Sequence, residues 1–273
     1  MLNIIYAVAT LGLLGLCFGL LLAYASKIFA VETDERLPLV VEALPGANCG
    51  GCGYPGCSGY AAAVVKGEAP INACAAGGNA CAAKIAEILG VKAEEVEPMM
   101  ACVRCRGGAN AKKKYEYMGI SDCLAASKVA SGPLECSYGC LGLGTCVQAC
   151  PYDAIEIVNG VALVHADKCV GCKKCVAACP RHIIELIPRN ADVRVACSSH
   201  EKGAALRQIC NIGCIGCKLC EKACEFDAIH VQDNLASIDF SKCTHCGKCA
   251  LACPRKLIIN ASEITSEVSQ KMA

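Results

Sequence analysis

Cysteine spacing constrains this chain more than any other feature, because 27 of its 273 residues are cysteine. The run Cys-x2-Cys-x2-Cys-x3-Cys occurs three times before residue 254. Thiols this close in sequence do not make independent disulfides, and disulfide frameworks are typical of short secreted chains. The spacing is therefore that of metal ligands. The complete runs are Cys169, Cys172, Cys175 and Cys179; Cys214, Cys217, Cys220 and Cys224; and Cys243, Cys246, Cys249 and Cys253.

A fourth run is irregular, because Leu143 stands where its second cysteine would be. An offset of 74 residues superimposes this run on the second complete one, and the same offset carries Cys136 to Cys210. We therefore interpret the region as two tandem two-cluster modules. We expect Cys136 to be the substitute ligand of the first module and Cys210 to be surplus in the second. The other cysteines of the irregular run are Cys140, Cys146 and Cys150.

Two kinds of metal centre compete for such sites. Zinc is commonly bound by paired Cys-x2-Cys motifs. Three close cysteines with a fourth followed by proline, as in two of the three complete runs, are typical of bacterial 4Fe-4S proteins. In those proteins each run gives three ligands to one cube and its last cysteine to the neighbouring cube. The sequence therefore predicts 4Fe-4S clusters, and a zinc-stabilised interaction module is the alternative.

Residues 1–26 are predicted to form a transmembrane helix. The uncharged apolar run from Ile4 to Ala25 is long enough, as a helix, to cross a bilayer core of roughly 30 Å. It lacks the basic flank of a signal peptide. Positive charge follows at Lys27 and Arg36, which places the N-terminus outside and the rest of the chain in the cytoplasm. Residues 27–45 are expected to be a linker.

Residues 46–130 are predicted to form a small four-cysteine domain with a helical extension. Its glycine-rich motif lets backbone N–H groups approach inorganic sulfide, and a zinc knuckle with the same ligands is the alternative. Helices are expected over 58–67 and 82–89. The predicted ligands are Cys49, Cys52, Cys57 and Cys74. Four further thiols either hold a sixth cluster or are partly free and buried: Cys81, Cys102, Cys105 and Cys123.

Residues 131–190 and 191–260 are predicted to be the two ferredoxin-like modules. Each contains an expected hairpin, over 153–164 with an Asn-Gly turn and over 227–238. Cys197 lies 74 positions after Cys123, so the two are expected to share a structural role, either in a cluster or as partly free, buried thiols. Residues 261–273 form a polar tail. The predicted fold class is α+β: a transmembrane helix, a four-cysteine Fe-S domain and two tandem two-cluster modules.

The chain carries little other catalytic equipment. It has no Walker loop, no Gly-x-Gly-x-x-Gly after a strand and no convincing nucleophile triad, so we expect no flavin or NAD on this chain. The net charge of +1 gives no indication of nucleic acid binding. The short basic run at 112–114 is expected to be a solvated face, and a docking patch for an acidic ferredoxin is the alternative. One-electron transfer through iron–sulfur clusters is the chemistry that remains.

The apolar segment, the stretch from Asn48 to Cys57, the stretch from Lys114 to Cys123 and the two modules together resemble the B subunit of the Rnf complex. The resemblance implies a membrane-bound ferredoxin:NAD oxidoreductase that exports Na+ or H+. It also implies that this subunit takes electrons from soluble reduced ferredoxin and passes them to other Rnf subunits. A membrane-tethered polyferredoxin serving a hydrogenase or another reductase is the alternative within electron transfer.

Overall fold

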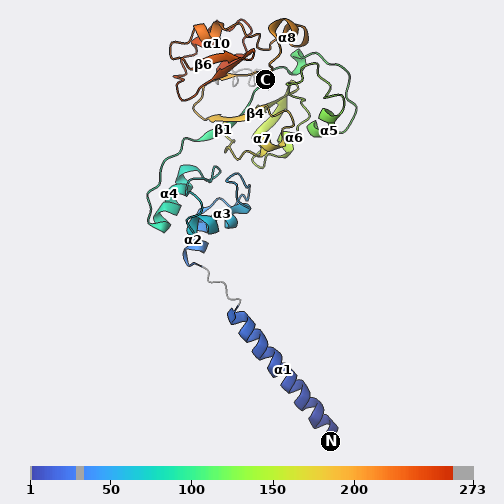
Figure 1. Cartoon of the computed structure of the whole chain (residues 1–273), viewed down its shortest axis with the longest axis vertical. Coiled ribbons are helices and arrows are strands. Elements are labelled where there is room, and N and C mark those ends of the chain that lie inside the picture. Colours follow the sequence, from blue (N-terminus) through green and yellow to red (C-terminus); the bar gives the residue numbers. More distant parts are fainter. Residues whose placement is uncertain (1, 29–33, 261–273) are drawn as a thin grey trace, which may run out of the picture.

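The structure, a computed structural model, describes residues 2–28 and 34–260, and contains one long N-terminal helix, a small helical domain and two α+β modules (Figure 1). The predicted fold class is confirmed. The predicted polar tail, 261–273, lies outside the described residues. The helices are α1 Leu2–Ile28, α2 Arg36–Ala43, α3 Gly56–Val65, α4 Gly78–Leu89, the 3-10 helix η1 Gly108–Asn110, α5 Cys123–Lys128, α6 Thr145–Gln148, α7 Lys174–Ala178, α8 Gly203–Ile209, α9 Leu219–Lys222 and α10 Lys248–Ala252. The strands are β1 Met99–Val103, β2 Ile155–Val158, β3 Val161–Val164, β4 Ile184–Pro188, β5 Val193–Val195, β6 Ile229–Gln232, β7 Leu235–Ile238 and β8 Ile258–Asn260.

Helix α1 corresponds to the predicted transmembrane segment. Its 27 residues rise about 40 Å at 1.5 Å per residue. The stretch Ile4–Ile28 is long and apolar enough to cross a membrane, and its large apolar side chains, such as Leu11, are exposed. Length and composition thus fit a membrane anchor.

Helices α2, α3 and α4 form the core of the four-cysteine domain. Val40 of α2, Tyr60 of α3 and Ile85 of α4 are fully buried against one another's helices. The predicted helices at 58–67 and 82–89 correspond to α3 and α4, and Gly90 ends α4 with a φ of 68°. Residues 36–43 were expected to be part of a linker. They form α2 instead, because their apolar face packs on the core of this domain.

The first module contains two antiparallel strand pairs. The hairpin of β2 and β3 confirms the prediction, with Asn159 and Gly160 at positive φ in the turn. Strand β1 pairs with β4, and Val103 lies opposite Ile184. Residues 99–103, assigned from the sequence to the extension of the four-cysteine domain, therefore contribute a strand to this module.

The second module repeats this arrangement. Strands β6 and β7 form the second predicted hairpin, and β5 pairs with β8. Val195 of β5 lies opposite Ile258, which is the repeat counterpart of Ile184 at the offset of 74. Strand β5 in the second module is thus the structural counterpart of β1 in the first.

The two modules contact each other directly. Phe240 of the second packs against the apolar core of the first. The backbone N–H of Lys112 donates to the carbonyl of Ile209 at 2.8 Å, and that of Asn211 donates to Asn110 at 3.1 Å. This backbone strip holds the modules in a fixed relation.

Candidate metal centres

A cavity of about 340 Å³ in the first module is lined by Cys123, Cys140, Cys146 and Cys179. Cys140 and Cys146 come from the irregular run, and Cys179 ends the next run, as the two-cluster pattern predicts. Cys136, which the sequence predicts to complete this group, does not line this cavity. Cys123 occupies that place, and Cys136 lies in a different cavity.

Cys123 reaches this cavity because the start of α5 is fixed to α6. The Asp122 side chain accepts hydrogen bonds from the Ala125 N–H at 2.7 Å and from the Thr145 hydroxyl at 3.0 Å. The Cys123 N–H donates to the Thr145 hydroxyl at 2.7 Å. Since Thr145 directly precedes Cys146, this network places the two thiols on the same cavity.

The second group of the first module joins Cys150 to the run of three cysteines that begins at Cys169. Burial raises the pKa of Cys175 to about 11, with smaller contributions from the thiols of Cys169, Cys172 and Cys150. The Ala101 N–H of β1 donates to Cys169 Sγ at 3.4 Å. These four thiols therefore lie near one another, again with three from one run and one from the other.

The second module has the same crossed arrangement in two cavities. One, of about 320 Å³, is lined by Cys214, Cys217, Cys220 and Cys253. The other, of about 340 Å³, is lined by Cys224, Cys243, Cys246 and Cys249. Burial raises the pKa of Cys220 to about 12 and that of Cys249 to about 11. An unmetallated thiol at these positions is therefore protonated at neutral pH.

The ligand loop of the four-cysteine domain is set by its glycines and by Asn48. The Asn48 side chain accepts a hydrogen bond from the Cys57 N–H at 2.8 Å. The Tyr60 hydroxyl donates to the Pro70 carbonyl at 2.7 Å and accepts from the Ala73 N–H at 3.2 Å, which fixes the chain just before Cys74. These contacts position the two ends of the four-cysteine set.

The same loop packs directly on the first module. A Cβ atom added at Gly51 would lie 2.7 Å from the carbonyl oxygen of Cys172, so a side chain has no room there. Tyr152 lies at this contact, and burial raises its pKa to about 12, with contributions from Cys49 and Cys172. The four-cysteine domain and the Cys172 group are therefore immediate neighbours.

The four thiols considered for a sixth cluster do not come together. Cys81 lies in the four-cysteine domain, where its hydrogen bond to Cys74 lowers the pKa of Cys74 to about 6. Cys102 is buried in β1, and Cys123 belongs to the first module. Cys105 instead lines a cavity with three other thiols: Cys136, Cys197 and Cys210.

Four of these groups line cavities, and their shared chemistry fits 4Fe-4S cubes. Each brings four cysteines to a largely apolar cavity, and all 27 cysteines are free thiols. Four thiolates around one zinc ion lie within about 4 Å of one another, whereas each thiolate of a cube binds a different iron and stands farther away. No three His, Cys, Asp or Glu side chains in residues 2–28 and 34–260 are arranged to hold a single ion.

Three family models match separate parts of the chain. A model described as an Fe-S cluster matches residues 44–76. Two models described as 4Fe-4S dicluster domains match residues 133–180 and 213–257. These matches correspond to the four-cysteine domain and to the two modules.

Several curated proteins are similar to the chain over nearly its whole length. The B subunit of the Na(+)-translocating ferredoxin:NAD(+) oxidoreductase complex of Acetobacterium woodii is 48% identical over 94% of this chain and 78% of the relative. The B subunit of the proton-translocating ferredoxin:NAD(+) oxidoreductase complex of Clostridium ljungdahlii is 44% identical over 99% of this chain and 98% of the relative. The B subunit of an ion-translocating oxidoreductase complex of Methanosarcina acetivorans is 42% identical, over 93% and 97%.

Proposed function

Because this chain belongs to the B-subunit family of Rnf-type ferredoxin:NAD oxidoreductase complexes, we propose that it is their membrane-anchored iron–sulfur electron relay. It accepts electrons from reduced soluble ferredoxin and passes them to other Rnf subunits, in a complex coupled to Na+ or H+ translocation. The observation that carries the proposal is the crossed four-cysteine grouping of both modules. The chain itself supplies binding sites and no substrate-converting site.

Five 4Fe-4S sites follow from the thiol groups described above. When bound, each cluster accepts and releases one electron at a time. Backbone N–H groups donate to ligand sulfurs, as from Ala228 to Cys224 at 3.4 Å, and such donors tune the reduction potential. The proposed ligands are Cys49, Cys52, Cys57 and Cys74; Cys123, Cys140, Cys146 and Cys179; Cys150, Cys169, Cys172 and Cys175; Cys214, Cys217, Cys220 and Cys253; and Cys224, Cys243, Cys246 and Cys249.

The second module is the end that receives electrons. Cys217 and Cys246 are exposed, whereas Cys172, the counterpart of Cys246 in the first module, is buried. Two large apolar side chains near the second module's thiols are also exposed: Phe226, which lines the Cys246 cavity, and Leu251, which is 89% exposed. An exposed ligand with apolar neighbours suits brief docking of a small protein donor, because electron transfer needs close approach.

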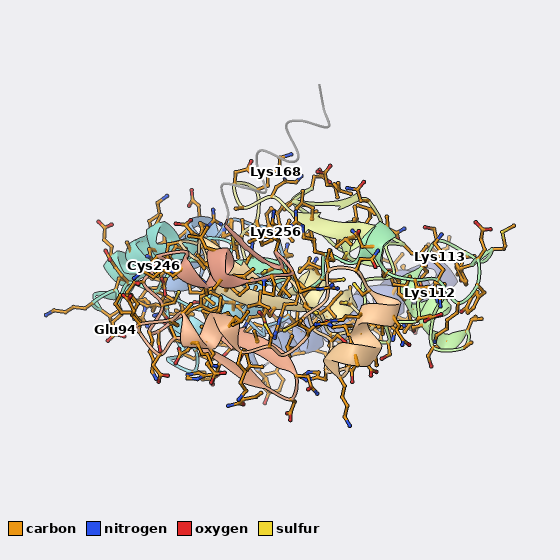
Figure 2. The ribbon with its side chains drawn as sticks, turned by 90° about the horizontal axis from the view of Figure 1, so that it is seen from above. Glu94, Lys112, Lys113, Lys168, Cys246 and Lys256 are labelled. Carbon is orange, nitrogen blue, oxygen red and sulfur yellow. The ribbon has the colours of Figure 1, made fainter. Side chains whose placement is uncertain are left out.

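The basic run at 112–114 is not part of this surface. Figure 2 shows Lys112 and Lys113 on one side of the molecule and Cys246 on the other. Lys112 pairs with Glu135 at 3.0 Å, and the Lys114 ammonium donates to the carbonyl of Ala130 at 3.4 Å. These contacts support the expectation of a solvated face.

The four-cysteine domain is the end that delivers electrons to the membrane subunits. It follows α1 closely in sequence, since α2 begins eight positions after Ile28. We place the Fe-S domains in the cytoplasm and the N-terminus outside, because Lys27 and Arg36 follow the apolar helix. Alkaline phosphatase fused to the N-terminus is then active, and the same fusion at the C-terminus is inactive. The opposite pattern would reverse the orientation.

The relay is tested with full-length chain purified anaerobically in detergent and mixed with reduced ferredoxin. We expect ferredoxin to be reoxidised while the visible iron–sulfur absorbance of the chain bleaches. Cys246→Ala should slow this reaction, because it removes an exposed ligand, whereas Cys102→Ala should leave it unchanged. A colourless protein with stoichiometric zinc would establish the interaction module instead. A brown protein that does not oxidise reduced ferredoxin but exchanges electrons with a hydrogenase would establish the polyferredoxin alternative.

A further inference from the structure

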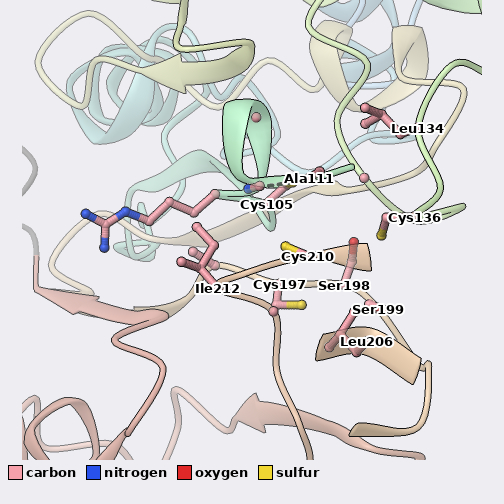
Figure 3. A pocket seen from close by; sticks show the side chains of 16 residues that line it. Cys105, Ala111, Leu134, Cys136, Cys197, Ser198, Ser199, Leu206, Cys210 and Ile212 are labelled. Atoms are coloured by element: carbon pink, nitrogen blue, oxygen red, sulfur yellow. Dashed lines mark hydrogen bonds between the residues drawn. The ribbon is translucent and has the colours of Figure 1, made fainter. Parts of the chain in front are cut away.

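A further cavity lined by four cysteines lies between the two modules. It has a volume of about 390 Å³, against 320 to 340 Å³ for the three cavities that contain ferredoxin motifs. Figure 3 shows its lining thiols, which come from four separate stretches of the chain. They are Cys105, Cys136, Cys197 and Cys210. None of the two-cluster motifs contains this set.

The four thiols form two pairs of equivalent positions. Cys136 and Cys210 are related by the internal repeat of 74 residues. Cys105 and Cys197 each follow by two residues the end of a counterpart strand, β1 or β5. Each module therefore contributes the same two positions to the cavity.

The sulfurs of Cys105 and Cys197 accept equivalent backbone hydrogen bonds. Cys105 Sγ accepts a hydrogen bond from the N–H of Cys140 at 3.4 Å, and Cys197 Sγ accepts one from the N–H of Cys214 at 3.4 Å. Cys140 and Cys214 are themselves repeat counterparts, and each begins a ferredoxin run. The Gly107 N–H also donates to Cys105 Sγ at 3.3 Å. These are the N–H to sulfur contacts that ligand thiolates receive in iron–sulfur proteins.

Gly107 lies beside two of the sulfurs. A Cβ atom added at Gly107 would lie 3.5 Å from Cys105 Sγ and 3.8 Å from Cys210 Sγ. Both sulfurs therefore face the same short piece of backbone. The Arg255 guanidinium donates to the Cys210 carbonyl at 2.8 Å and holds that end of the cavity.

Apart from the hydroxyls of Ser198 and Ser199, the side chains of the lining offer only sulfur as a metal ligand. The described residues around the cavity include no histidine or acidic side chain. Cys136, Cys197 and Cys210 are each buried, and burial raises the pKa of Cys105 to about 12. Four soft ligands in an apolar cavity select thiolate-binding iron or zinc over Mg2+ or Ca2+. The same number of thiols and the same kind of N–H to sulfur contacts as in the other cavities favour a cube over a single ion.

We propose that Cys105, Cys136, Cys197 and Cys210 bind a sixth 4Fe-4S cluster that joins the two modules. Each thiol releases its proton and binds one iron of the core, and the iron and sulfide come from the cellular assembly machinery that fills the other sites. The site adjoins the Cys140 group through Cys105 and the Cys214 group through Cys197. It therefore completes a contiguous row of sites from the four-cysteine domain to the exposed end. The binding claim does not depend on the identity of the electron donor.

Metal content of the full-length chain tests the site without any variant. Anaerobically purified protein should contain about 24 iron and 24 sulfide per chain, six cubes of four each. About 20 iron, with or without one zinc, would overturn the proposal.

Variants then locate the cluster. Cys136→Ala and Cys210→Ala should each lower the content by about four iron, and the double variant should also lose about four, because both thiols hold the same cube. Cys102→Ala is the control, since Cys102 is buried in β1 but lines none of the cavities described, and it should retain about 24. EPR of the reduced protein should keep the signals of the other clusters, which verifies folding. A double variant that loses about eight iron, or Cys210→Ala at full content, would refute the assignment.

Discussion

Replacing Cys123 by alanine should remove one cluster from the first module. Cys123 shares its cavity with Cys140, Cys146 and Cys179, so we expect these four thiols to hold one cube. The loss is about four of about 24 iron atoms. Because Cys123 and Cys146 are expected to bind the same cube, the double variant Cys123→Ala/Cys146→Ala should retain about 20 iron atoms, as the single variant does. Cys136→Ala/Cys146→Ala should retain about 16, because these thiols line different cavities.

The assay is iron and acid-labile sulfide per chain, measured on anaerobic full-length protein together with EPR after reduction by dithionite. The two double variants differ by one thiol and remove the same number of ligands, so general damage to folding affects both. If Cys136→Ala/Cys146→Ala retained about 20 iron and Cys123→Ala/Cys146→Ala retained about 16, the grouping would be reversed. Cys136 would then be the substitute ligand, as the repeat alone suggests.

Three further changes test the scaffold around the sites. Tyr60→Phe leaves the Pro70 carbonyl and the Ala73 N–H without their hydrogen-bond partner, which costs about 1–3 kcal/mol for each group left unsatisfied. A chelator should therefore remove the iron of the four-cysteine domain faster. Tyr54→Phe, which removes only a hydroxyl contact at the surface, should not have this effect. Gly51→Val places a side chain against the backbone of the first module at Cys172. It should weaken the magnetic coupling between the cluster of the four-cysteine domain and the cluster of the Cys172 group, while the iron content stays unchanged. If the coupling were also unchanged, the two domains would not be in contact at Gly51. Asp122→Ala removes the acceptor that fixes α5 and should speed iron loss from the Cys123 site, more than Asp122→Asn, which keeps an acceptor.

The ferredoxin sets were predictable because their ligands recur at short, fixed spacing. The two hairpins and the apolar helix followed from equally local signals, such as the turn at Asn159 and Gly160. The four-cysteine motif matched a family model for the same reason. Local pattern was also sufficient for the core of α3 and α4, but it missed α2, whose short apolar face has meaning only against those helices.

The place of Cys123 in the first module's cavity was not predictable from the repeat. The offset of 74 pairs Cys123 with Cys197, whereas the strand pairing makes Cys105 the counterpart of Cys197. Cys105 and Cys136 are 31 positions apart in the first module, whereas Cys197 and Cys210 are 13 positions apart in the second. The longer segment contains α5 and supplies Cys123, which shifts the register of the repeat. The sequence did contain one signal for the correct grouping: Cys136 and Cys210 are repeat counterparts, and giving both the same role would have placed them in one site.

The crossed ligand sets impose an order on biogenesis. Cys140 is synthesised well before Cys179, so the ribosome must release both runs of a module before its cavity can close around metal. The cavity between the modules can be completed only after those of the first module, since Cys210 lies in the second module. Unfilled thiols must therefore persist until most of the chain has been translated, and they are open to oxidation during that interval.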